Sequence, residues 1–373
     1  MNRVSVLAAT CAAMLAVPCL AAPDEKPQPK IQIAILLDTS SSMDGLIAQT
    51  KEQLWQIVNT FATAKRDGKK PRLEIALYQY GNDSLSSEAG FIQQLSPLTT
   101  NLDLISEKLF ALRTNGGNEY CGQVIQKAID QLSWSDSKKD LKLIYIAGNE
   151  PFNQGPVDFR KAVSKAIAKG VVVNTLHCGD EATGASTGWK EAAMLADGNF
   201  ITIDQNRAVV RIDAPQDQEL VRLNAALNKT YIGYGRAGAE GMERQRAQDG
   251  NAAAMAPSAM ATRAVSKSTG FYDNSGWDLV DAKKKGAVKL EAMAKDDLPA
   301  EMRELKPEER KAFVDGKEKE RAKIVEQIKV LSQERDAFVT TETKKRAAAG
   351  AATSGGALIQ SAKTQAEKNA FTF

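Results

Sequence analysis

The chain has 373 residues, of which 43% are hydrophobic and 25% charged, so it can bury the core of one large domain and still carry an extension. The net charge is only +3, with both signs interspersed, and aromatic residues make up 6% without interleaving with a basic stripe. These properties argue against nucleic acid as a partner.

The N-terminus predicts export. Residues 1–21 have the features of a Sec-type signal peptide: Arg3 supplies a positive charge, Val4 to Ala22 is apolar and uncharged, and small residues precede a cleavage point near Ala21. We therefore expect a bacterial periplasmic or secreted protein. An uncleaved membrane anchor is the alternative. No later segment is long and apolar enough to span a bilayer, so none should remain after cleavage.

The stretch from Ile31 to Asp38 introduces the first candidate site. It follows a charged, Pro-rich linker over residues 22–30, and Ile31 to Leu37 is a nearly unbroken apolar run, as in a parallel strand buried on both faces. Asp38, Ser40 and Ser42 come next on one short loop. Their oxygens are hard donors suited to Mg²⁺, Mn²⁺ or Ca²⁺. The alternative is a loop in which one of these side chains merely caps the next helix.

Strands and helices then alternate. The expected strands are 31–37, 73–81, 91–95, 141–147, 171–177 and 200–204, and the expected helices are about 44–64, 102–112, 120–133, 159–168, 188–196 and 216–228. Strand 91–95 should be antiparallel, because only a short loop precedes it. The alternation predicts an α/β fold: a doubly wound, mostly parallel sheet with helices on both faces, to which a helical C-terminal extension is added.

The D-x-S-x-S loop after a buried first strand, together with this order of elements, resembles the von Willebrand factor type A (VWA) domain over about residues 31–230. In that family three loops at the carboxyl end of the sheet form a metal-ion-dependent adhesion site (MIDAS). The resemblance implies that Asp38, Ser40 and Ser42 act as the ligands of the first loop. It also implies Mg²⁺, or Ca²⁺ or Mn²⁺, as the ion, and a partner that completes its coordination with a carboxylate.

The second and third loops depart from the family pattern. Where the family usually has a Thr after Gly-Gly, this chain has Asn118, followed by Glu119. Where it usually has an Asp after the strand, this chain has Gly148, followed by Asn149 and Glu150. We expect these Asn and Glu side chains to supply the missing oxygens. The alternative is that both loops have lost ligation.

Two cysteines lie beyond the signal segment, Cys121 and Cys178, and both fall at the carboxyl edge of the predicted sheet. In an exported chain this predicts a structural disulfide between them. Two free buried thiols are the alternative.

An enzyme is not favoured. His177 is the only histidine, and it ends a strand where a packed histidine is the commoner case. No G-x-S-x-G elbow, phosphate-binding loop or CxxC pair accompanies it.

After residue 230 the composition changes. Residues 231–268 are rich in small residues and predict a flexible linker, 269–346 predict a helical extension, and 347–373 predict a low-complexity tail. Within the extension, Ile324, Ile328, Leu331 and Phe338 form a short seam. It predicts packing of one face within a helical hairpin, with a coiled coil as the alternative.

The sequence therefore predicts a non-enzymatic protein of the cell envelope that binds a protein or an envelope ligand through a divalent metal. One alternative is a structural or assembly protein with a vestigial metal site, acting through its C-terminal helices. The other is a hydrolase that uses His177.

Overall fold

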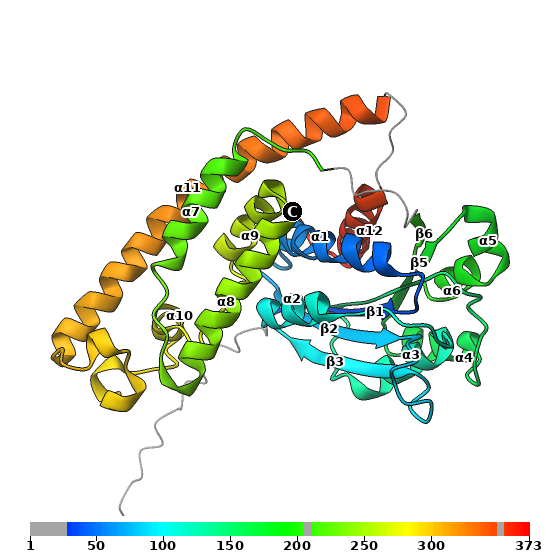
Figure 1. Ribbon diagram of the computed structural model, residues 1–373, viewed down its shortest axis with the longest axis horizontal. Helices are drawn as coiled ribbons and strands as arrows, with labels where there is room; N and C mark the ends of the chain where they lie inside the picture. The colour runs from blue at the N-terminus through cyan, green and yellow to red at the C-terminus, as the bar shows by residue number, and fades with distance from the viewer. Residues whose placement is uncertain (1–27, 204–210, 349–353) are drawn as a thin grey trace, which may run out of the picture.

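We describe the protein from a computed structural model, in which residues 28–203, 211–348 and 354–373 are described. The predicted signal peptide and most of the linker after it lie outside these residues. Six strands form one sheet (Figure 1). They are β1 (Lys30–Asp38), β2 (Arg72–Tyr80), β3 (Ile92–Thr99), β4 (Leu141–Gly148), β5 (Val172–Cys178) and β6 (Phe200–Ile203).

The sheet order is β3-β2-β1-β4-β5-β6, with every pair parallel except β2 and β3. The predicted fold class is confirmed, including the antiparallel third strand. Strand order reverses between β1 and β4, so the carboxyl ends of these central strands meet at a switch point, where open α/β sheets place their ligands.

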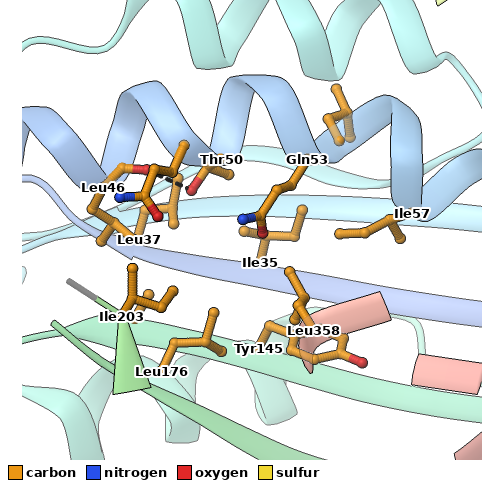
Figure 2. A pocket seen from close by; sticks show the side chains of 13 residues that line it. Ile35, Leu37, Leu46, Thr50, Gln53, Ile57, Tyr145, Leu176, Ile203 and Leu358 are labelled. Carbon is orange, nitrogen blue, oxygen red and sulfur yellow. Dashed lines mark hydrogen bonds between the residues drawn. The ribbon is translucent and has the colours of Figure 1, made fainter. Parts of the chain in front are cut away.

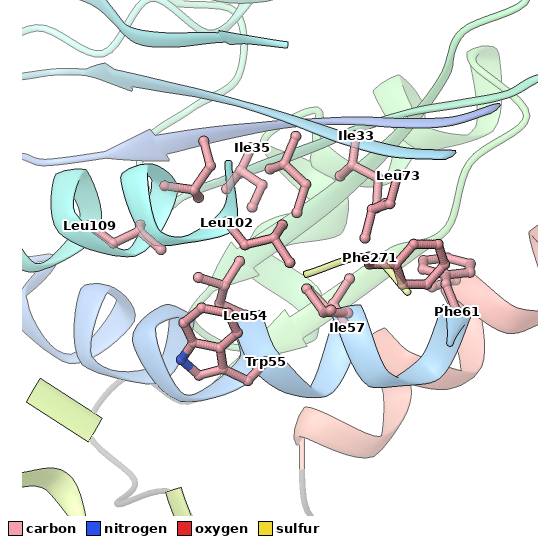
Figure 3. Close-up of a cluster of buried hydrophobic side chains, with 14 of the residues drawn as sticks. Ile33, Ile35, Leu54, Trp55, Ile57, Phe61, Leu73, Leu102, Leu109 and Phe271 are labelled. Carbon is pink, nitrogen blue, oxygen red and sulfur yellow. The ribbon is translucent and has the colours of Figure 1, made fainter. Parts of the chain in front are cut away.

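Helices cover both faces because β1 and β4 are apolar along almost their whole length. The helices of this part of the chain are α1 (Asp44–Phe61), α2 (Leu102–Ala111), α3 (Cys121–Gln131), α4 (Phe159–Ala168), α5 (Glu181–Ser186) and α6 (Trp189–Leu195). Side chains of α1 and α2 fill the apolar cluster on one face, and Figure 3 shows Leu102 between α1 and the strands of the sheet. Side chains of α3, α4 and α6 fill the cluster on the other face.

The segment expected as a flexible linker is helical, so that prediction is wrong. After α7 (Asp217–Asn228), residues 231–268 contain α8 (Gly235–Met255) and α9 (Pro257–Ser268), which pack on α2 and on α1 and α7. Gly238, Gly241 and Ala252 lie on the buried side of α8. Small residues there let neighbouring chain segments approach closely, and an added Cβ at Gly241 would lie 2.4 Å from the Trp277 ring. The small residues that suggested a flexible linker therefore allow neighbouring elements to pack closely on α8.

Buried charges join this extension to the sheet domain. Arg263 of α9 is fully buried, stacks on Trp55 of α1, and donates to Asp103 of α2 at 2.7 Å and to Asp249 of α8 at 2.6 Å. Lys267, also buried, lies 3.0 Å from Asp249. Such a network is stable only when every charge is paired, so α8 and α9 are held in one position against α1 and α2.

The long helix α11 (Pro307–Ala348) packs one face on α7 and α9, and Figure 1 shows it running alongside α7. A short helix α10 (Leu279–Lys284) packs against it. Ile324 and Ile328 are buried in the main core, and Arg335, which interrupts the seam, pairs with Asp217 at 2.6 Å. The seam therefore packs within the chain, against α7 and α9 rather than within a helical hairpin.

The low-complexity tail, expected to be disordered or loosely helical with a frayed end, contains a packed helix, and its end is held by contacts rather than frayed. Residues Ser354–Lys368 form α12, which packs on α1 and β6. Phe371 is buried, and Thr372 pairs with Lys65 in an isolated antiparallel bridge. Leu358 of α12 also closes one end of a narrow, mostly apolar cavity of about 30 Å³ between α1 and the sheet, drawn in Figure 2. Among the described helices, none has the length and apolar character that crossing a bilayer requires.

Candidate metal centre

We call the three loops at the carboxyl end of the sheet the rim. Hydrogen bonds hold the first of these loops in place. Asp38 ends β1 fully buried, and its Oδ1 accepts a 2.7 Å hydrogen bond from the amide of Ser40. The hydroxyl oxygens of Ser40 and Ser42 lie 3.4 Å apart. Neighbouring loops hold the backbone, because the amide of Thr39 donates to Tyr80 and its carbonyl accepts from Asn115. Asp38, Ser40 and Ser42 are thus brought together.

The second loop places Glu119 beside Asp38. Glu119 is 4% exposed and precedes α3, whereas Asn118 is exposed. Both carboxyl side chains lie against Gly81: an added Cβ there would be 2.7 Å from Asp38 Oδ1 and 2.7 Å from Glu119 Cγ. Gly81 also has a φ of +75°, which favours glycine. This glycine is what allows two acids to meet above the end of β2.

The third loop has no room for the carboxylate that the family usually carries. An added Cβ at Gly148 would lie 2.6 Å from Tyr80 Oη and 3.2 Å from Asp38 Cβ. Asn149 is half-buried, whereas Glu150 is exposed and accepts a 3.3 Å hydrogen bond from Gln154. The acid nearest to Asp38 is therefore Glu119 of the second loop, and Glu150 acts on both only at longer range.

Burial raises the pKa of both acids of this pair, Asp38 and Glu119. Burial raises the pKa of Asp38, which contacts with Glu119 and Ser40 offset in part. Burial also raises the pKa of Glu119, and the charge of Asp38 raises it further. The pair therefore holds a proton at neutral pH when no cation neutralises it.

These residues fit a hard divalent cation. Asp38 Oδ2 and Asn149 Oδ1 are buried and accept no hydrogen bond from an amide or hydroxyl of the described chain, so Asp38 is left with the proton that it shares with Glu119 unless a cation replaces it. A buried carboxylate oxygen without a partner is costly unless something fills the position. The described residues hold no group of three or more His, Cys, Asp and Glu side chains suited to a metal. With only two acids, Asp38 and Glu119, at this rim, an ion there would also need the neutral oxygens of Ser40, Ser42 and Asn149 as ligands.

Two residues that support the rim, Tyr80 and Asn82, were not singled out from the sequence. Tyr80 donates to the carbonyl of Ala147 at 3.0 Å and fills the space below Gly148. Asn82 ties Thr39 to the loop at Arg113. Tyr80 and Asn82 flank Gly81. The Tyr-Gly-Asn sequence at the end of the second strand could have indicated that this turn supports the rim. Asp44 lies just after the first loop but is an exposed acid in the first turn of α1. It accepts a 2.8 Å hydrogen bond from the hydroxyl of Thr114.

The predicted disulfide is not formed, which corrects that expectation. Cys121 and Cys178 are both free and buried. Cys178 packs with Leu176 in the cluster on one face of the sheet, whereas Cys121 begins α3 in the cluster on the other face. Position at the same edge was inferred correctly, but the sheet separates the two thiols.

His177 is packed. It is 1% exposed, and its ring centroid lies 5.6 Å from that of Trp189. Gly179 and Gly184 crowd it so closely that an added Cβ at either would come within 2.7 Å of the imidazole. Burial also lowers the pKa of His177. These surroundings leave the ring little access to a substrate.

Comparison with solved structures gives distant matches. BatB from Bacteroides thetaiotaomicron is 15% identical, covers 47% of this chain and 90% of its own, and has a TM-score of 0.36. The vWF domain of the type V pili tip protein Mfa5 from Porphyromonas gingivalis is 12% identical, with 48% and 90% covered and a TM-score of 0.34. Proximal thread matrix protein 1 from the mussel byssus, with a zinc occupied MIDAS motif, is 12% identical, with 48% and 43% covered and a TM-score of 0.35.

This chain thus spans less than half the length of that mussel protein. A comparison with curated protein sequences gives no match. Residues 32–200, however, match the family model of the von Willebrand factor type A domain. That match supports assigning the part of the chain that carries the sheet and the three rim loops to the von Willebrand factor type A domain family.

Proposed function

We propose that this protein binds a partner protein or envelope ligand through a divalent cation at the rim, without catalysing a reaction. The observation that carries the proposal is the buried carboxyl of Asp38, whose Oδ2 accepts no hydrogen bond from an amide or hydroxyl, beside the carboxyl of Glu119 and two serine hydroxyls. A bound Mg²⁺, Mn²⁺ or Ca²⁺ would supply an open coordination position for a carboxylate of the partner.

The variant loops give this site its own character. Glu119 takes the role that the third loop has in the family pattern, because Gly148 leaves no space for an acid there. Asp38 and Glu119 then place two negative charges on one cation, which favours tight binding of the ion. The exposed Asn118 and Glu150 lie on the surface of the same loops, where they would contact the partner rather than the ion.

A competing function is assembly through the C-terminal helices with an inactive rim. Its support is the exposed side of α11, where Val330 is 48% exposed. Deleting the extension would not separate the two functions, because Ile328 and Phe371 belong to the main core. Point substitutions at the surface are needed instead.

The test is co-purification of a tagged protein from its own cell envelope after crosslinking, in Mg²⁺ and in EDTA. Asp38→Ala should remove the crosslinked partner as EDTA does, while Val330→Glu should leave it in place. Loss of the partner with Val330→Glu and not with Asp38→Ala would favour assembly through α11. If both variants retain the partner, the rim proposal is contradicted too, because Asp38→Ala should have removed it.

A further inference from the structure

The edge of the sheet opposite the rim carries its own surface, which we call the basic surface. It is formed by the turn 65–72 between α1 and β2, the entry to β1, the loop before β4 and the C-terminus. Backbone contacts join these segments: Lys65 pairs with Thr372, and Arg72 donates to Pro29. Side chains join them too, because Arg66 donates to the carbonyl of Lys139 and to Asn369.

Positive charge gathers there. The turn 65–72 reads KRDGKKPR, with five basic residues and one acid. Lys65, Lys70 and Lys138 are exposed, and the side chains of Arg72 and Lys139 are 54% and 63% exposed. Lys368 adds a further exposed charge next to Asn369.

The nearby acids are largely engaged. Glu74 is 10% exposed and lies between Lys30 and Arg72. Asp140 is buried and accepts from the amide of Lys30. Asp67 pairs with Lys139 at 3.4 Å, which leaves the exposed Asp136 and Glu367 against the remaining lysines. The outward face of this edge is therefore positive.

The rim edge has the opposite sign. Acids on or beside its loops are Asp38, Asp44, Asp83, Glu88, Glu119, Glu150, Asp158, Asp180 and Glu181, and they outnumber the bases Arg113, Lys127, Arg160, Lys161 and Lys190. A net charge of +3 for the whole chain hides this separation. Charge of opposite sign at the two edges gives the domain a preferred orientation in front of a charged surface.

We propose that the basic surface docks on an anionic lipid membrane and holds the rim away from it. The exposed Lys65, Lys70 and Lys138 lie on this surface, and Gln28 at the start of the described chain donates to the carbonyl of Lys70. Basic clusters are attracted to anionic headgroups, and each exposed charge adds to the affinity.

This arrangement also sets the height of the rim. Strand β1 runs nine residues from the basic surface to Asp38. At about 3.3 Å per residue, the metal centre would stand roughly 30 Å above the lipid headgroups. It would face outward, where a partner can reach it. A single-stranded nucleic acid is disfavoured, because the described residues of this surface offer no row of aromatic side chains for stacking.

The test is co-sedimentation of the protein, as purified from the cell envelope, with vesicles of phosphatidylglycerol and phosphatidylcholine or of phosphatidylcholine alone. The readout is the ratio of binding to the two vesicles, because an apolar segment by itself binds both alike. Lys65→Glu/Lys70→Glu/Lys138→Glu should lower that ratio by about tenfold or more, and about 0.5 M salt should do the same. Lys319→Glu/Lys323→Glu/Lys344→Glu on the exposed side of α11 has the same charge change and should keep it.

All samples contain EDTA, so the result does not depend on the metal centre, and Asp38→Ala should behave as the unmodified protein does. Equal ratios for the unmodified protein and the basic-surface variant would overturn the proposal. An equal loss in the α11 variant would also overturn it, since net charge alone would then explain the binding.

Discussion

At the scale of single residues, the rim is defined by what two glycines allow. Gly81 lets Asp38 and Glu119 lie together, and Gly148 leaves space for Tyr80 where the family pattern has an acid. The sequence predicted that Asp38, Ser40 and Ser42 lie together on one loop, because they follow a recognisable strand. It left Glu119 and Glu150 as equals, because no pattern in the sequence shows which of them is buried.

Gly148→Ala should lower the free energy of unfolding by about 1–3 kcal/mol, because its Cβ would collide with the Tyr80 hydroxyl. In a Tyr80→Phe background the penalty should shrink, since the colliding oxygen is gone. Urea denaturation of the two single variants and the double variant measures this coupling.

Gly116→Ala is the matched control, because the nearest atoms to an added Cβ there lie at 3.6 Å. Its stability should stay within about 0.5 kcal/mol of the unmodified protein. If Gly148→Ala proves equally mild, the rim has space that the structure does not indicate.

At the scale of elements, the strands were predictable and helix α8 was not. Strands β1 and β4 are buried on both faces and read as apolar runs. Helix α8 buries Gly238, Gly241 and Gln245 in place of an apolar stripe, so the usual periodic signal is absent. In α9, Arg263 and Lys267 look like solvent-facing residues in the sequence, but paired acids on other elements make their burial tolerable.

Asp249 links these helices and should make their docking sensitive to acid. Burial alone would raise its pKa, but Arg263 and Lys267 outweigh that effect and hold the pKa well below its usual range. A carboxyl whose folded pKa is depressed stabilises the protein above its unfolded pKa of about 4, and that contribution is lost as the pH falls.

Asp249→Asn should therefore cost about 3 kcal/mol at pH 7 and flatten the loss of stability below about pH 4. Denaturant midpoints across the acid range measure both effects, with the exposed Asp136→Asn as a control. Parallel pH curves for Asp249→Asn and the unmodified protein would show that this carboxylate is not what stabilises the α8–α9 contact.

At the scale of the whole molecule, the extension and the sheet domain share one core. Residues of α1, α7, α11 and α12 lie in a single apolar cluster with β1 and β4. The sequence suggested separate units joined by a linker, because composition changes near residue 230. The ring of Phe373 lies 6.4 Å from that of Phe61 at the end of α1, and a contact between residues more than 300 positions apart leaves no trace in the local sequence pattern.

Phe371→Ala should lower the free energy of unfolding by about 3–4 kcal/mol, because its ring is buried beside the Arg66 guanidinium at the base of the sheet. Phe373→Ala, at a 39% exposed ring two residues later, should have a far smaller effect. Unfolding followed by tryptophan fluorescence and by circular dichroism should show one coincident transition in each case. Two separate transitions would mean that the extension unfolds independently.

The central claim is that the rim binds a divalent cation through Asp38 with Glu119 as its second acid. Calorimetric titration of the protein with Mg²⁺, Mn²⁺ and Ca²⁺ tests it most directly, beside Asp38→Ala, Glu119→Gln and Glu150→Gln. We expect binding of at least one ion, no binding by Asp38→Ala, affinity weakened by about tenfold or more in Glu119→Gln, and little change in Glu150→Gln. Binding that survives Asp38→Ala, or none in the unmodified protein, would contradict the account.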